Sequence, residues 1–246
     1  MKRVLSIIVA IAAICGLTMC SSEKKKQAKP KEVAERAASD VSELQKLAEA
    51  GDANAQYELA KCYYNGEGVT KDAVEALKWC RKSAEQGYAK AQCNLAKCYY
   101  NGEGVTKDLV EAVKWCRKAA EQGYAEAQCN LASCYYNGWG VTKDLAEAVK
   151  WCRKSAEQGY AMAQYILGGF YFSGDGVAED AVEAAKWYRK AAEQGVVYAQ
   201  FSLAVCYYYG WGVTKDLAEA VKWYRKAAQQ GDQQAKNALN DLGETW

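Results

Sequence analysis

Cysteine offers more chemistry than any other residue type in this chain, which holds eleven cysteines and no histidine. A thiolate can act as a nucleophile or a metal ligand, and two thiols can pair as a disulfide. A nucleophilic cysteine commonly depends on a neighbouring histidine, which is also the commonest general base and metal ligand. The composition therefore weighs against most hydrolytic mechanisms, and we predict no catalytic residue and no cofactor.

Nine of these cysteines lie in a sequence that repeats every 36 residues. The period appears in an aspartate column (Asp72, Asp108, Asp144, Asp180 and Asp216) and a tryptophan column (Trp79, Trp115, Trp151, Trp187 and Trp223). Five units follow, at residues 54–89, 90–125, 126–161, 162–197 and 198–233. A single helix pair of this length cannot cover its own apolar faces, whereas stacked pairs form a continuous core. The repeat predicts an all-α solenoid of five helix-turn-helix units.

Each unit is predicted to contain two helices joined by a glycine-containing loop. In the second unit, the Asp108 side chain can accept from the first-turn N–H groups of the second helix, and Glu111 can reach back to the cap. Gly123 then ends this helix, because glycine tolerates the left-handed conformation of a C-cap. Solenoid ends need polar caps, which we place at residues 32–53, a capping helix, and at 234–246, a closing helix and tail.

The repeated motif is A-Q-C-N-L-A-x-C-Y-Y-N-G-x-G-V-T-K-D-L, followed by E-A-V-K-W-C-R-K-[AS]-A-E-Q-G. Over residues 54–233 it closely resembles the Sel1-like repeat. This resemblance implies a right-handed alpha-solenoid related to tetratricopeptide arrays, whose first helices line a concave face. It also implies a non-catalytic scaffold that binds proteins. Gly168 and Gly169 depart from the pattern, and we expect them to loosen the first helix of the fourth unit by about 1 kcal/mol each.

The repeated cysteines fall into three columns. These are Cys93 and Cys129; Cys62, Cys98, Cys134 and Cys206; and Cys80, Cys116 and Cys152. In an antiparallel helix pair, the start of the first helix lies opposite the later part of the second, which could bring Cys93 near Cys116 and Cys129 near Cys152. Other units hold Tyr or Phe in these columns, as expected of buried apolar positions. Disulfides and buried thiols both stay open. Metal binding is not predicted, because C-x4-C spacing separates two thiols by about 140° around a helix.

Residues 1–19 have the charged start and the apolar run of a secretory signal peptide. The ending L-T-M-C resembles a bacterial lipobox, which implies that Cys20 carries the lipid and becomes the mature N-terminus. Residues 20–31 then form a flexible basic linker. The alternative is an uncleaved anchor, because Val4 to Cys20 spans 17 residues and a helix of about 17 to 25 residues crosses a bilayer. Both alternatives predict a tethered protein of the bacterial cell envelope, facing the periplasm or on the outer membrane.

Predicted partner-binding residues lie on the first helices and in the loops that follow them. The helix positions are polar in the second and third units and apolar in the fifth, namely Asn94, Lys97, Asn101, Asn130 and Asn137, then Val205 and Tyr209. Trp139 and Trp211 occupy a loop position held elsewhere by Glu or Asp, and exposed indoles often mark contacts. The alternatives are drift among solvated helix positions, and tryptophans that fold onto the adjacent repeat.

The leading functional hypothesis is a membrane-tethered scaffold with an unknown protein or peptide partner. The second is a module that binds cell-wall glycan or peptidoglycan through aromatic and amide groups. An enzyme of the β-lactamase kind, described for some cysteine-rich Sel1-like proteins, lacks its motifs, since S-x-x-K occurs only in the linker and K-T-G is missing. Nucleic acid is not an expected partner, because 32 Lys and Arg are balanced by 30 Asp and Glu.

Overall fold

A computed structural model describes residues 30–246, which form twelve helices and contain no strand. The helices are α2 (Pro30–Glu49), α3 (Ala53–Asn65), α4 (Ala73–Glu85), α5 (Ala89–Asn101), α6 (Leu109–Glu121), α7 (Ala125–Asn137), α8 (Leu145–Glu157), α9 (Ala161–Ser173), α10 (Ala181–Glu193), α11 (Val197–Tyr209), α12 (Leu217–Gln229) and α13 (Gln233–Asp241). The predicted all-α class with paired helices is confirmed. Below, α3, α5, α7, α9 and α11 are called A helices, and α4, α6, α8, α10 and α12 are called B helices.

The predicted signal peptide, the Cys20 lipidation site and most of the predicted linker lie outside the described residues. The last two linker residues, Pro30 and Lys31, belong to α2. Within residues 30–246, no helix combines the length and the apolar character that a membrane crossing requires.

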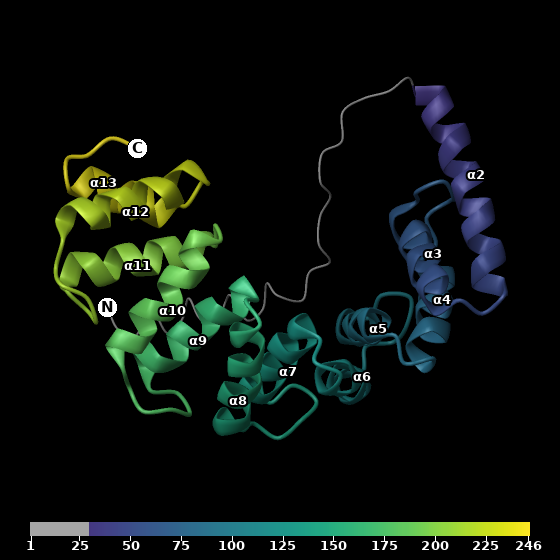
Figure 1. The fold of residues 1–246 in the computed structure, drawn as a ribbon, viewed down its shortest axis with the longest axis horizontal. Helices are drawn as coiled ribbons and strands as arrows, with labels where there is room; N and C mark the ends of the chain where they lie inside the picture. The colour runs from purple at the N-terminus through teal and green to yellow at the C-terminus, as the bar shows by residue number, and fades with distance from the viewer. Residues whose placement is uncertain (1–29) are drawn as a thin grey trace. The chain divides into compact units, whose positions relative to one another are not determined.

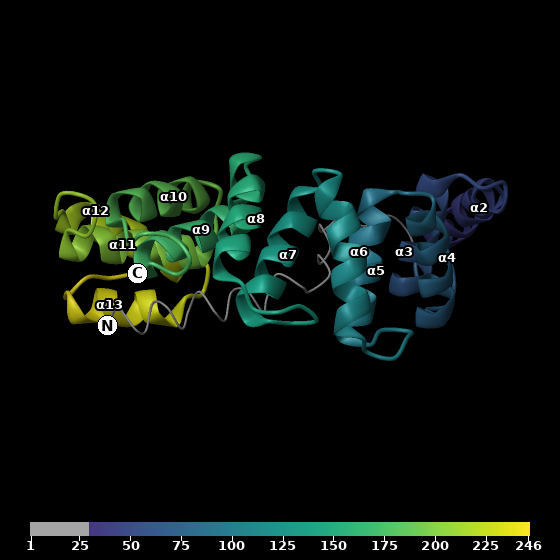
Figure 2. The same cartoon turned by 90° about the horizontal axis from the view of Figure 1, so that it is seen from below.

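The helices form two compact units in which sequence neighbours pack together. In the first unit, α2 packs on α3, α3 on α4, α4 on α5 and α5 on α6. Helix α7 belongs to this unit as far as Cys134. In the second unit, each helix from α8 to α13 packs on the next. Figures 1 and 2 show this side-by-side order inside each unit. Fully buried leucines such as Leu59 and Leu95 in the first unit, and Leu167 and Leu203 in the second, fill the layers between helices.

Each B helix begins at the predicted aspartate cap. Asp108 Oδ1 accepts hydrogen bonds of 3.0 Å from the N–H groups of Val110 and Glu111. Asp72, Asp144, Asp180 and Asp216 cap their helices in the same way. The other half of the predicted capping box is wrong, because the Asp108 N–H donates to the carbonyl of Tyr99 on the A helix. Glu111 instead forms an ion pair with Lys114, at 3.0 Å.

The second glycine of each inter-helix loop lets one repeat approach the one before it. A Cβ atom at Gly104, Gly140, Gly176 or Gly212 would lie 2.4, 2.0, 2.3 or 1.8 Å from a carbonyl oxygen on the first residue of the preceding B helix. These four glycines also have φ between +65° and +71°. Only glycine combines this backbone conformation with so close an approach.

A row of buried glutamines, which the sequence analysis did not predict, links the repeats. Gln92 Nε2 donates to the Ala84 carbonyl at the end of α4, at 3.1 Å, and Gln92 Oε1 accepts from Gln122 Nε2 at 2.7 Å. The same two bonds recur at Gln56, Gln164 and Gln200. Each of these glutamines therefore adds a second hydrogen bond to a carbonyl in the last turn of the preceding helix, which also accepts from the N–H of the glycine after that helix.

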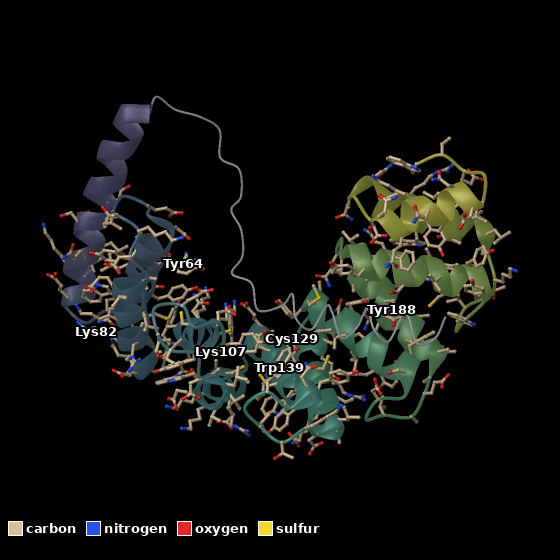
Figure 3. All side chains as sticks on the ribbon, turned by 180° about the vertical axis from the view of Figure 1, so that it is seen from behind. Tyr64, Lys82, Lys107, Cys129, Trp139 and Tyr188 are labelled. Carbon is tan, nitrogen blue, oxygen red and sulfur yellow. The ribbon has the colours of Figure 1, made fainter. Side chains whose placement is uncertain are left out.

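Gly168 and Gly169 do not interrupt the A helix of the fourth repeat, since α9 runs from Ala161 to Ser173. A Cβ on Gly168 would lie 2.7 Å from the ring of Tyr188, which is fully buried (Figure 3). Tyr188 stands in the column that holds Cys80 in the first repeat. The glycine therefore makes room for a larger side chain on the facing helix, as close packing requires.

Candidate functional site

A polar pocket of about 320 Å³ lies on the A helices of the first unit. Its lining residues come from α3, α5 and the start of α7, and Figure 3 labels one of them, Tyr64. They are Tyr57, Lys61, Tyr64, Asn65, Lys90, Asn94, Lys97, Tyr124 and Glu126. We call this cavity the A-helix pocket. It brings together two of the predicted partner-binding residues, Asn94 and Lys97.

An ion pair between Lys97 and Glu126 joins α5 to α7 at this pocket. The Lys97 side chain is only 4% exposed, and its Nζ lies 2.5 Å from Glu126 Oε1. The Tyr124 hydroxyl donates to the other carboxylate oxygen at 2.9 Å. Burial and the adjacent Glu126 charge raise the pKa of Tyr124, so its hydroxyl remains a donor at neutral pH. The buried ammonium is thus compensated by a carboxylate that Tyr124 holds in place.

The other polar groups of the A-helix pocket are exposed to solvent, or they form hydrogen bonds and ion pairs that a ligand can replace. Asn94 Nδ2 donates to the Tyr57 hydroxyl at 3.3 Å. Lys61 Nζ lies 2.6 Å from Glu58, and both of these side chains are about two-fifths exposed. Lys90 is exposed and forms no ion pair with any other described residue. This set of ammonium, amide and hydroxyl groups suits the binding of a polar ligand.

The remaining predicted helix positions have different surroundings. Asn130 is buried, and its Nδ2 lies 3.6 Å from Cys93 Sγ. Val205 is also buried. Asn101 donates to Glu103 in the following loop at 2.9 Å, and Asn137 is half-buried at the end of α7.

The two loop tryptophans pack on an aromatic ring of the preceding repeat. The ring centroids of Tyr100 and Trp139 are 5.3 Å apart, and those of Phe172 and Trp211 are also 5.3 Å apart. Figure 3 labels Trp139. This is the packing that the second interpretation of the tryptophans expected.

The acidic residues at the same loop position contact the same helix position of the preceding repeat. The Tyr136 hydroxyl donates to Asp175 at 3.2 Å. Glu103 lies beside Tyr64, whose pKa is raised by burial and by the Glu103 carboxylate. The loop residue therefore contacts the preceding A helix by a ring contact at Trp139 and Trp211, and by a tyrosine–carboxylate hydrogen bond at Asp175. Phe172, which has no hydroxyl, is contacted by a tryptophan.

We expect Trp139→Glu to be tolerated better than Trp211→Glu. A glutamate at 139 can accept from the Tyr100 hydroxyl, as Asp175 does from Tyr136, whereas Phe172 offers no donor to a glutamate at 211. The unsatisfied carboxylate of W211E should lower the free energy of unfolding by about 1–3 kcal/mol more than the W139E substitution does. Urea unfolding followed by circular dichroism measures the difference. Adding Phe172→Tyr should rescue W211E, and equal losses in the two single variants would contradict the expectation.

Tyr209 and Trp211, two predicted partner-binding residues, stack on each other at the end of α11. Their ring centroids are 4.7 Å apart and their planes differ by 19°, and Tyr209 is 40% exposed. Tyr208 contacts Tyr209 edge-on at 4.7 Å. Tyr208, Tyr209 and Asp241 border a second pocket, of about 150 Å³. The second unit thus presents an aromatic surface, formed by Tyr208, Tyr209 and Trp211, beside a carboxylate.

All nine cysteines of the repeats are free thiols, and eight are buried. Cys116 Sγ donates to the Ala127 carbonyl at 3.2 Å, and Cys152 Sγ donates to the Ala163 carbonyl at 3.3 Å. Neither predicted disulfide, from Cys93 to Cys116 or from Cys129 to Cys152, is formed within residues 30–246. Their pairing under oxidising conditions stays a prediction. In the same part of the chain, no three Cys, Asp or Glu side chains are grouped as a metal site.

We expect the buried thiols to resist alkylation while the protein is folded. Burial raises the pKa of five of them to about 12, namely Cys93, Cys98, Cys129, Cys134 and Cys206. At pH 8 only about one such thiol in 10⁴ is then ionised, and the thiolate is the reactive form. The half-buried Cys62 should react first. Iodoacetamide labelling with and without urea, read by mass spectrometry, tests this, and rapid labelling of Cys129 in the folded protein would contradict it.

The five repeats match the family model described as the Sel1 repeat, at residues 53–88, 89–124, 125–160, 161–196 and 197–232. Each matched segment begins one residue before the corresponding predicted unit. None of the curated proteins matches the chain.

Two solved structures are similar to the chain at the level of sequence and fold. A Sel1 repeat protein from Oxalobacter formigenes is 36% identical, with a TM-score of 0.77 over 93% of this chain and 86% of that one. The protective antigen c5321 of uropathogenic Escherichia coli, which displays an SLR fold, is 46% identical, with a TM-score of 0.79. The match covers 82% of this chain and 43% of the antigen, so this chain spans less than half of the antigen's length. Because the family model matches every repeat from residue 53 to 232, the chain belongs to the Sel1 repeat family.

Proposed function

We propose that this chain is a non-catalytic scaffold, tethered to a bacterial membrane and facing away from the cytoplasm, that binds a protein or peptide on its A helices. Sel1 repeat proteins generally act as scaffolds for protein interactions. The observation that carries the proposal is the A-helix pocket, in which three successive A helices contribute side chains to one polar cavity. A peptide laid across these helices would contact one repeat after another.

Site-specific photo-crosslinking in the native cell tests the binding face. A photoreactive residue at Lys90, on the rim of the pocket, should capture a discrete protein that the same residue at Lys114 does not. Lys114 is a matched control, because it is an exposed lysine of the same unit on the B helix α6. Identical capture from both positions, or capture from neither, would contradict the proposal.

The tether rests on the sequence of the first twenty residues, which contains the signal-like run and the L-T-M-C ending. The intact mass of the protein purified from its membrane fraction tests it. We expect the mass of residues 20–246 plus acyl chains. An unacylated chain that starts at Met1 would overturn lipidation and leave the uncleaved anchor as the alternative.

Binding of cell-wall glycan is the second candidate function, and the aromatic surface formed by Tyr208, Tyr209 and Trp211 supports it. Sugar rings stack on flat aromatic faces, and Asp241 lies at the adjacent pocket to accept from hydroxyl groups. If this candidate holds, the protein is retained on isolated sacculi, soluble glycan competes it off, and Tyr209→Ala releases it. Retention that soluble glycan does not affect would reject it.

A further inference from the structure

We propose that the A-helix pocket recognises a carboxylate of its peptide partner, either an acidic side chain or a free C-terminus. This inference rests on the proposed scaffold function and specifies the chemistry of the partner. It follows from the charge balance of the lining residues, from which of them already have partners, and from the way the pocket holds a carboxylate of its own.

The lining of the pocket has an excess of positive charge. It includes three lysines, Lys61, Lys90 and Lys97, and a single carboxylate, Glu126. Both oxygens of that carboxylate are engaged inside the protein, one by Lys97 and the other by Tyr124. Glu126 therefore adds little attraction for a cation and leaves the two outer lysines to face the ligand.

The two outer lysines are available for a ligand. Lys90 is exposed and has no ion-pair partner among residues 30–246. Lys61 is paired with Glu58 on the same helix, and both side chains are about two-fifths exposed. Such surface pairs contribute about 0–1 kcal/mol, so Lys61 can exchange this partner for a ligand at little cost.

Glu126 shows how the pocket accommodates a carboxylate, since an ammonium and a tyrosine hydroxyl donate to its two oxygens at 2.5 and 2.9 Å. A carboxylate from a partner would meet ammonium donors on Lys61 and Lys90. Asn65 and Asn94 add amide donors and acceptors that suit the peptide backbone.

The residues of the pocket favour a carboxylate over a phosphate. Arginine, whose planar fork matches phosphate in two parallel hydrogen bonds, is not among the lining residues.

The fold does not require lysine at these positions. The equivalents of Lys61 and Lys97 in the later repeats are Ser133, Gly169 and Val205, and the later equivalents of Lys90 are Glu126, Met162 and Tyr198. The positive charge at these positions is thus confined to the first two repeats. Lys97 is accounted for by its ion pair with Glu126, and a specific partner accounts for the exposed Lys90.

A displayed peptide library, presented once with free and once with amidated C-termini, tests the proposal on the full chain. We expect the recovered peptides to be enriched in Asp and Glu or to require the free C-terminus, and the two presentations distinguish these sources. Binding should weaken as salt is raised. Lys90→Glu should weaken it by about tenfold, since two unit charges change near the ligand. Lys90 is exposed, so the fold should survive, and Lys114→Glu on α6 is the matched control.

The outcomes separate this inference from the scaffold function. Peptides that bind without acidic enrichment, or that bind K90E as tightly as the natural protein, would overturn the carboxylate site and leave the scaffold standing. Recovery of no peptide at all would overturn both. If inorganic phosphate or anionic lipid vesicles protect Lys90 from chemical modification and no acidic peptide does, the pocket would be assigned to a different ligand.

Discussion

Replacing Gly212 with alanine is expected to destabilise the second unit more than the same replacement at any other loop glycine of that unit. The new Cβ would lie 1.8 Å from the Ala181 carbonyl oxygen at the start of α10, so the fifth repeat must move away from the fourth. Overpacking of this kind costs about 1–3 kcal/mol, and the left-handed backbone adds about 1–2 kcal/mol. Urea unfolding should show a combined loss of about 3 kcal/mol.

Gly195→Ala is the matched control for this experiment. Gly195 also has a positive φ, +89°, but nothing lies within 4 Å of its added Cβ. The G195A variant should lose only the free energy that the left-handed backbone costs an alanine, about 1–2 kcal/mol. If G195A and G212A unfold at the same urea concentration, the close approach of the repeats is not what requires glycine at 212.

Glu126→Gln is expected to destabilise the first unit by up to about 3 kcal/mol, because it leaves the buried Lys97 ammonium without its carboxylate. Lys97→Met should cost less, because it removes the charge and leaves Glu126, which is 25% exposed, to be hydrated. Urea midpoints of the two variants give the comparison. A greater loss in K97M than in E126Q would contradict this account of the pair.

The control for that pair is Glu111→Gln. Glu111 and Lys114 form an exposed ion pair three residues apart in the same unit. Such pairs contribute little, so its removal should change the free energy of unfolding by less than about 0.5 kcal/mol.

The features that sequence reasoning predicted correctly depend on local chemistry. The aspartate column begins the B helices because a side-chain oxygen can satisfy first-turn N–H groups within three residues. The 36-residue period follows from the same local signals repeated along the chain. Glu111 shows the limit of such rules, because the cap N–H that it should reach already has a partner nine residues earlier, on the A helix.

The features that sequence reasoning missed depend on contacts between repeats. The A-Q pair in every unit was a visible signal for the glutamine row, but its meaning requires the preceding B helix to end beside it. The A-helix pocket needs three helices in register, so Asn94 and Lys97 could be predicted as polar positions but not as neighbours of Glu126. Gly168 can similarly be explained only by the Tyr188 ring, which would clash with a Cβ atom at that position.

The packing of sequence neighbours in each unit also has a mechanical consequence. Because the main contacts of each helix are with the helices before and after it, a helix pair pulled from one end can leave while the next pair keeps its internal packing. One 36-residue repeat drawn out to full extension lengthens the chain by about 120 Å. Under tension, each unit should therefore unfold in a series of steps, one helix pair at a time, rather than in a single cooperative event.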